Sequence, residues 1–124
     1  MSKVPEDLKY TKTHEWVKLT GNIAEIGITD YAQHQLTDIV FVDFPKIGDK
    51  KKAGEVLLTV ESVKSAEDVY SPVEGEIVEI NKTVQDKPEI LNTDSYANWM
   101  VKMKVTGKTV DYLSPDNYRK HIGE

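Results

Sequence analysis

Short apolar strands separated by turn residues constrain the fold of this chain more than any other feature. Trp16–Leu19 and Ile23–Ile28 flank the turn Thr20–Asn22 and alternate apolar with polar side chains, which is the pattern of a half-buried β-hairpin. Five further runs of this kind are Ile39–Phe44, Val56–Val60, Asp68–Tyr70, Glu76–Ile80 and Trp99–Val105. Short strands at near-regular spacing, with Gly, Pro and Asp between them, predict a β-sandwich or barrel.

Two helices are expected beside these strands. Thr29 or Asp30 can cap a short helix over 31–36. Ser114 can cap a second helix over 115–122, because it precedes a proline at the first helical position. The glycine that follows residue 122 ends this helix.

An internal repeat also bears on the fold. The pattern G-x-I-x-E-I occurs at Gly21–Ile26 and again at Gly75–Ile80, and an Asp-Lys turn at 49–50 or 86–87 follows each copy before the next apolar strand. Two copies of one pattern are what a pair of quasi-symmetric small sheets leaves in a sequence. The chain of 124 residues fits a single domain over residues 1–124.

Composition excludes several classes of function. The net charge of −5 and the lack of a Lys/Arg-rich stripe argue against a nucleic-acid partner. The absence of cysteine removes disulfides, cysteine zinc sites and thiol nucleophiles. No apolar run approaches the ~20 residues of a membrane span, and residues 1–7 resemble neither a signal peptide nor a transit peptide. A cytoplasmic protein with no membrane partner is expected.

Lys64 is the residue that most strongly suggests a function. It lies in a polar turn between the apolar run Val56–Val60 and the strand Asp68–Tyr70. A lysine at a hairpin tip is held away from the protein body on a rigid base, which suits covalent attachment of a long cofactor arm. The alternative is an ordinary solvated charge. The turn residues are Glu61, Ser62, Val63, Lys64 and Ser65.

The sequence resembles the H-protein family of the glycine cleavage system over nearly the whole chain. The matching segments are residues 10–17, 26–33, 38–42, 54–55, 60–64 and 70–73. This resemblance implies a mostly-β barrel-sandwich hybrid, like other lipoyl- and biotinyl-carrier domains, with short peripheral helices and a C-terminal helix. It also implies lipoate joined to Lys64 through an amide, on a hairpin that includes Glu61, Ser62, Val63 and Ser65.

The neighbours of the lysine favour lipoate over biotin. Biotin domains usually flank the target lysine with methionines, whereas Val63 and Ser65 flank Lys64 here. Lipoyl domains of 2-oxoacid dehydrogenases usually carry Asp-Lys-Ala at the tip. Val63 in place of that aspartate again favours the H-protein family.

The resemblance implies a carrier component of a multienzyme system and not an enzyme in its own right. Lipoyl-Lys64 would receive the aminomethyl group of glycine from a pyridoxal-phosphate glycine decarboxylase, the P protein. It would pass this group to a tetrahydrofolate-dependent aminomethyltransferase, the T protein, and be reoxidised by the flavin enzyme dihydrolipoamide dehydrogenase, the L protein. A lipoate ligase or octanoyltransferase would attach the arm. One arm that visits several sites raises the effective concentration at each.

Two alternatives to this function remain open. The first is an H-like lipoyl carrier in another pathway, such as lipoate relay to other apoproteins or sulfur oxidation. The second is a structural β-domain without a cofactor. A monomer is expected.

The resemblance further implies a cleft into which the loaded arm folds back. The positions that carry over are Thr13, Glu15 and Asp68. A carboxylate suits this role because the loaded arm ends in a protonated amine. Each of the three residues can also be read as an ordinary solvated polar side chain. The family often has a histidine at the position of Gln35, and here a histidine precedes that glutamine.

The histidines suggest no independent catalysis. His14 beside Glu15 is a conceivable acid–base pair. Adjacent residues on a strand point to opposite faces, however, so we do not expect the two to share a substrate. His34 and His121 lack metal-like spacing to Asp or Glu. No catalytic residue and no metal site is predicted.

Overall fold

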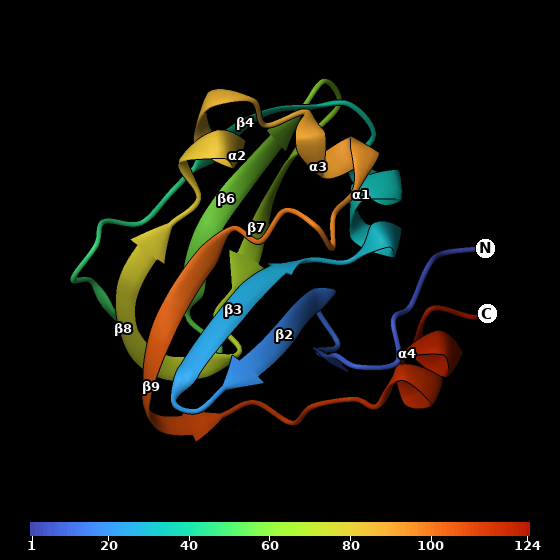
Figure 1. The fold of residues 1–124 in the computed structure, drawn as a ribbon. Helices are drawn as coiled ribbons and strands as arrows, with labels where there is room; N and C mark the ends of the chain where they lie inside the picture. Colours follow the sequence, from blue (N-terminus) through green and yellow to red (C-terminus); the bar gives the residue numbers. More distant parts are fainter.

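Two antiparallel sheets form the body of the protein, with helices at their edges (Figure 1). The computed structural model describes residues 1–124. The larger sheet has six strands in the order β1 (Lys9–Tyr10), β2 (Glu15–Thr20), β3 (Ile23–Ile28), β9 (Val101–Thr109), β8 (Val73–Ile80) and β5 (Lys50–Lys51). The smaller has three in the order β4 (Ile39–Asp43), β6 (Val56–Ser62) and β7 (Ala66–Tyr70). The prediction of a mostly-β fold of two sheets is confirmed.

The two copies of the repeat lie in one sheet, on either side of β9 (Figure 1). Ile26 of β3 and Ile80 of β8 both pair with Val101 of β9. The two glycines differ in their surroundings. Gly21 makes the β2–β3 turn with a φ of 61°, whereas Gly75 lies inside β8, where a Cβ would come within 2.2 Å of a backbone carbonyl. The prediction that the repeat marks two quasi-symmetric small sheets is therefore wrong: the sheets have six and three strands, and the repeat reflects two strands that share a partner in the larger one.

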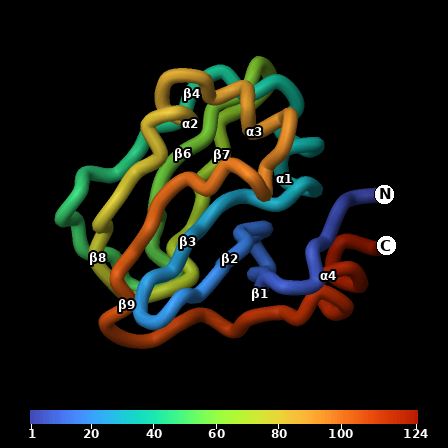
Figure 2. The backbone as a smooth tube through the Cα atoms, viewed as in Figure 1, coloured from blue at the N-terminus to red at the C-terminus, as the bar shows by residue number.

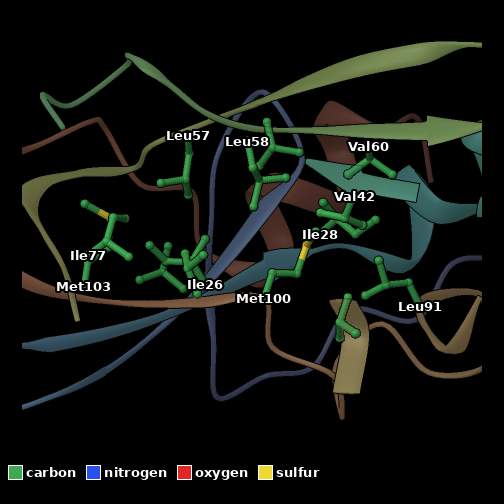
Figure 3. Packing of buried hydrophobic residues seen from close by; sticks show 14 of the residues in the cluster. Ile26, Ile28, Val42, Leu57, Leu58, Val60, Ile77, Leu91, Met100 and Met103 are labelled. Atoms are coloured by element: carbon green, nitrogen blue, oxygen red, sulfur yellow. The ribbon is translucent and has the colours of Figure 1, made fainter. Parts of the chain in front are cut away.

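The main core lies between the two sheets. Leu57, Leu58 and Val60 of the smaller sheet face the residues of β3, β8 and β9 (Figure 3). Val60 and Ile77 are completely buried, in agreement with the alternation of their strands. The cluster comprises 18 buried side chains. Burial of this apolar area supplies the main driving force for packing one sheet on the other.

A second, smaller cluster attaches the C-terminal helix to the larger sheet. Tyr118 stacks on Tyr10 with ring centroids 4.7 Å apart, and Trp16 packs beside them. The two chain ends lie next to each other, and the backbone N–H of Ser2 donates to the carboxylate of Glu124 (Figure 2). The helix α4 (Pro115–His121) is thereby held beside the start of β2.

The two predicted helices form with the expected caps. Thr29, and not Asp30, caps α1 (Asp30–Leu36), because its hydroxyl accepts from the backbone N–H of Ala32 at 3.2 Å. Ser114 caps α4 by accepting from the backbone N–H of Asn117. A membrane-spanning helix would have to be longer and more apolar than any of the four helices of this structure.

The segment between β8 and β9 was predicted incorrectly. The Asp-Lys pair at 86–87 ends a helix, α2 (Lys82–Asp86), and a second helix, α3 (Ile90–Thr93), follows before β9. β9 begins at Val101 instead of Trp99 and extends to Thr109. Helices of five and four residues are too short to show a 3.6-residue period, and buried Val84 and Leu91 anchor them.

Candidate functional site

The β6–β7 hairpin ends in a turn at one end of the molecule (Figure 1). Lys64 lies in this turn and is exposed to solvent. Ser62 closes the turn, because its backbone N–H donates to the carbonyl of Ser65 at 2.7 Å. The Ser62 hydroxyl also accepts from the backbone N–H groups of Lys64 at 3.3 Å and Ser65 at 3.1 Å. The backbone of the tip is therefore tied at three points, while the lysine side chain stays free of ion pairs.

Val63 gives the tip a further anchor and an apolar surface. Its backbone N–H donates to the carbonyl of Asp38 at 3.0 Å, which ties the turn to the segment before β4. Its side chain is 67% exposed and lies next to the lysine in sequence. An exposed apolar side chain beside a free amine is a suitable contact for an enzyme that must reach that amine.

A hollow of about 410 Å³ adjoins the lysine, and we refer to it as the Lys64 hollow. Its walls come from the hairpin, from α1 and from the loop before β2. The residues that line it are Thr13, His14, Ile28, Tyr31, Ala32, Gln35, Leu36, Lys64, Ser65, Glu67, Asp68 and Val69. Two of the predicted cleft residues, Thr13 and Asp68, are thus brought beside the lysine. Gln35, at whose position H proteins often have a histidine, also lines this hollow and belongs to α1.

Glu15 lies in a second hollow, also of about 410 Å³, which we name the Glu15 hollow. Its side chain is 1% exposed. One carboxylate oxygen accepts from the hydroxyls of Thr11 and Thr13, each at 2.5 Å, and the other accepts from the backbone N–H of Tyr70 at 3.2 Å. Burial raises the pKa of the Glu15 carboxyl, and these donors oppose that effect. Glu15 is therefore not an ordinary solvated side chain.

Thr13 connects the two hollows. It lines both of them and donates its hydroxyl hydrogen bond to Glu15. Asp68, by contrast, is exposed and accepts from the hydroxyl of Thr59 at 3.1 Å. The buried carboxylate of Glu15 lies behind Thr13, and the exposed carboxylate of Asp68 lines the Lys64 hollow. The two together place negative charge on two sides of Thr13.

The placement of His14 differs from the sequence prediction. We expected it on a strand next to Glu15, but it precedes β2 and has a φ of 73°. We expected the side chains of His14 and Glu15 to be separated because neighbours on a strand point to opposite faces. They are separated in the structure, but because they line different hollows. His14 lines the Lys64 hollow and Glu15 lines the other.

The sequence did not reveal the neighbours of His14. Its Nδ1 lies 2.8 Å from the hydroxyl of Tyr118, and its ring centroid lies 5.5 Å from that of His121. Burial, together with the nearby His121, lowers the pKa of the His14 imidazole. No signal in the sequence joins residues so far apart, because only the docking of α4 brings them together.

The remaining polar groups form no metal site. His34 is exposed and lies 3.6 Å from the carboxylate of Asp30, four residues earlier on the same helix. No group of three His, Cys, Asp or Glu side chains is placed to hold a metal ion. The arrangement consists of a presented amine, an adjoining hollow and acidic groups around it, and it suits a covalently attached arm that ends in a cation.

Comparison with known proteins gives consistent results. Residues 8–123 match the family model described as glycine cleavage H-protein. A probable glycine cleavage system H protein of Picrophilus torridus is 60% identical over 124 residues, with complete coverage of both chains. The glycine cleavage system H protein of Carboxydothermus hydrogenoformans is 47% identical, with 100% of this chain and 98% of that protein covered.

A solved structure agrees with the fold. The crystal structure of a glycine cleavage system H protein from Mycobacterium marinum superposes with a TM-score of 0.92 at 34% sequence identity. The match covers 98% of this chain and 100% of the other.

Proposed function

Because this chain belongs to the glycine cleavage H-protein family and is a lipoyl carrier of the glycine cleavage system, we propose that Lys64 holds the lipoate as an amide of its Nζ. The observation that carries this proposal is the tip of the β6–β7 hairpin. There the amine is exposed, free of ion pairs and mounted on a backbone tied by Ser62. A rigid base with a free amine suits an attaching enzyme, because little conformational entropy is lost when that enzyme binds the turn.

The residues around Lys64 fit such an arm. Bound lipoate supplies a dithiolane that receives the aminomethyl group of glycine and is later reoxidised. Glu61, Ser62, Val63 and Ser65 form the attachment hairpin in this proposal. Ser62 orients the turn, and exposed Val63 offers an apolar contact beside the amine.

The chemistry of the cycle resides in partner enzymes. The proposed partners are the P, T and L proteins, together with a lipoate ligase or octanoyltransferase. His14 and Glu15 line different hollows, which supports a carrier without catalysis of its own. We further propose a monomeric, single-domain carrier in the cytoplasm, where neither nucleic acid nor membrane is a partner.

Thr13, Glu15 and Asp68 would shelter the loaded arm. The Lys64 hollow contains the exposed carboxylates of Glu67 and Asp68, and its Thr13 wall leads to buried Glu15. The aminomethyl cargo is cationic, so negative charge on both sides of Thr13 stabilises it there. A sheltered cargo meets less water and is hydrolysed more slowly.

Glycine-dependent loading tests this function. Incubation of the lipoylated protein with glycine and glycine decarboxylase should add one aminomethyl group, as followed by intact mass. The lipoylated Lys64 protein without the decarboxylase is the control. Failure to load would support the alternative of an H-like carrier in another pathway.

The sheltering role predicts faster loss of the cargo from two variants. Glu15→Gln keeps the side-chain size but removes the buried charge, so the cargo should decay roughly tenfold faster, as expected when a charge-assisted hydrogen bond of ~1.5–3 kcal/mol is weakened. Asp68→Asn should accelerate decay at most about fivefold, because exposed charges contribute ~0.2–1 kcal/mol. The measurement is the mass of the loaded protein over time.

Glu61→Gln is the matched control, since Glu61 is exposed on the same hairpin and lines neither hollow. It should decay like the wild type. Equal decay in all three variants and the wild type would remove the sheltering role of both acidic residues.

A further inference from the structure

His14 is placed in the wall of the Lys64 hollow by an uncommon backbone conformation. Its φ of 73° lies in the left-handed region, which few residues other than glycine adopt. The backbone holds it on both sides: its N–H donates to the carbonyl of Thr11 at 3.2 Å, and its carbonyl accepts from the N–H of Thr29 at 3.1 Å. The ring is thereby turned toward Tyr31, with centroids 4.9 Å apart. Such a conformation is strained and is often found at functional positions.

The hydrogen bonds around Tyr118 determine which ring nitrogen of His14 carries the proton. Thr29 is completely buried, and its hydroxyl already accepts from the backbone N–H of Ala32. The only available partner for the Thr29 hydroxyl proton is the Tyr118 oxygen at 2.7 Å. Tyr118 must then donate its own proton to His14 Nδ1, 2.8 Å away. The opposite direction would leave a buried hydroxyl proton without an acceptor, which is costly.

The neutral ring therefore carries its proton on Nε2, and this nitrogen is free. No protein group forms a hydrogen bond with His14 Nε2. If this nitrogen were buried, it would be a buried polar atom without a partner, but the only such atoms are Ser95 Oγ and Tyr112 Oη. Nε2 is consequently open to solvent in a residue that lines the Lys64 hollow. The orientation of the Nε2–H bond and the tautomer of the ring are therefore both fixed in the protein without a ligand.

The groups that face His14 keep it uncharged. Tyr118 and His121 approach from α4, and Tyr31 from α1. His121 donates from Nε2 to the carbonyl of Lys12 at 2.8 Å. The lowered pKa of His14 agrees with this arrangement. Across the hollow lie Lys64, Glu67 and Asp68, all of them exposed.

We propose that His14 binds the sulfur end of the lipoyl arm through its Nε2–H, and that Tyr118 and Thr29 are positioning residues that hold this donor in place. The inference rests on the proposed attachment of lipoate to Lys64. Reduction turns the disulfide of the arm into two thiols. The thiolate that either thiol can form accepts a hydrogen bond more strongly than a disulfide does, so the contact favours the reduced arm. The C-terminal helix thus becomes part of the arm site, although it lies far from Lys64 in sequence.

Nitrogen-15 NMR of histidine-labelled protein tests the proposal directly. Long-range proton–nitrogen spectra distinguish Nε2–H from Nδ1–H, and His14→Asn, which tolerates a positive φ, assigns the His14 signals. We expect the Nε2–H form in the protein without lipoate. We further expect the Nε2 proton to shift and exchange more slowly when the lipoylated protein is reduced, and to return when it is oxidised.

Tyr118→Phe separates the positioning role from packing. It keeps the stack on Tyr10 but removes the hydroxyl, so His14 should populate both tautomers and lose at least half of its response to reduction of the arm. Tyr112→Phe removes a hydroxyl outside this network and should leave the response unchanged. Thermal melts and intact mass establish that both variants are folded and lipoylated.

The outcomes distinguish the two proposals. Absence of lipoate from Lys64 after treatment with a ligase would overturn the proposed function, and this inference with it. A lipoylated protein whose His14 carries its proton on Nδ1 would overturn this inference alone. The same holds if the Nε2 proton gives one signal in the reduced, oxidised and unmodified proteins.

Discussion

We expect that replacing Lys64 with arginine will abolish lipoylation and leave the fold unchanged. Arginine keeps the positive charge, but its guanidinium cannot form the lipoyl amide. The side chain is exposed and makes no ion pair, so the free energy of unfolding should change by no more than about 0.5 kcal/mol. Intact mass after incubation with a lipoate ligase should show one lipoyl group on the wild type and none on Lys64→Arg.

Lys52→Arg is the matched control for this experiment. Lys52 is also exposed and also belongs to a turn, but this turn precedes β6, at the end of the β6–β7 hairpin opposite to the Lys64 tip. It should be lipoylated like the wild type. If Lys64→Arg gained as much lipoate as Lys52→Arg, attachment at Lys64 would be rejected.

We expect Ile77→Ala to destabilise the protein by about 2–5 kcal/mol, whereas Val78→Ala should have a small effect. Ile77 is completely buried and pairs with Met103 of β9, so truncation removes apolar contacts and opens a cavity between the sheets (Figure 3). Val78 is 37% exposed on the opposite face of β8, and Val78→Ala should cost at most about 1 kcal/mol.

Urea unfolding of the three proteins measures this difference. If the free energy of unfolding depends on urea concentration with the same slope in all three proteins, the substitutions change the stability of the folded state and not the compactness of the unfolded state. If the two variants lost equal stability, or Val78→Ala lost more, the strand would be buried on its other face and the register of β8 would be wrong.

The parts of the fold that local chemistry controls could be predicted from the sequence. Alternation located the β2–β3 hairpin and the burial of Ile77, because side chains on a strand alternate between two faces. The caps at Thr29 and Ser114 were predictable, since capping is a contact over three residues. The helices α2 and α3 were not, because they depend on a few buried anchors instead of a periodic pattern.

The candidate site also has features that could be predicted from the sequence and features that could not. The position at which the amine of Lys64 is presented could be predicted from the sequence, because a turn between two strands is a local feature. That Glu15 and His14, neighbours in sequence, line different hollows is visible only in the folded protein. The same is true of the contact between Tyr118 and His14. The physical reason is that these contacts depend on the docking of α4 on the larger sheet and on one left-handed backbone conformation at His14, and no local pattern of side chains encodes either.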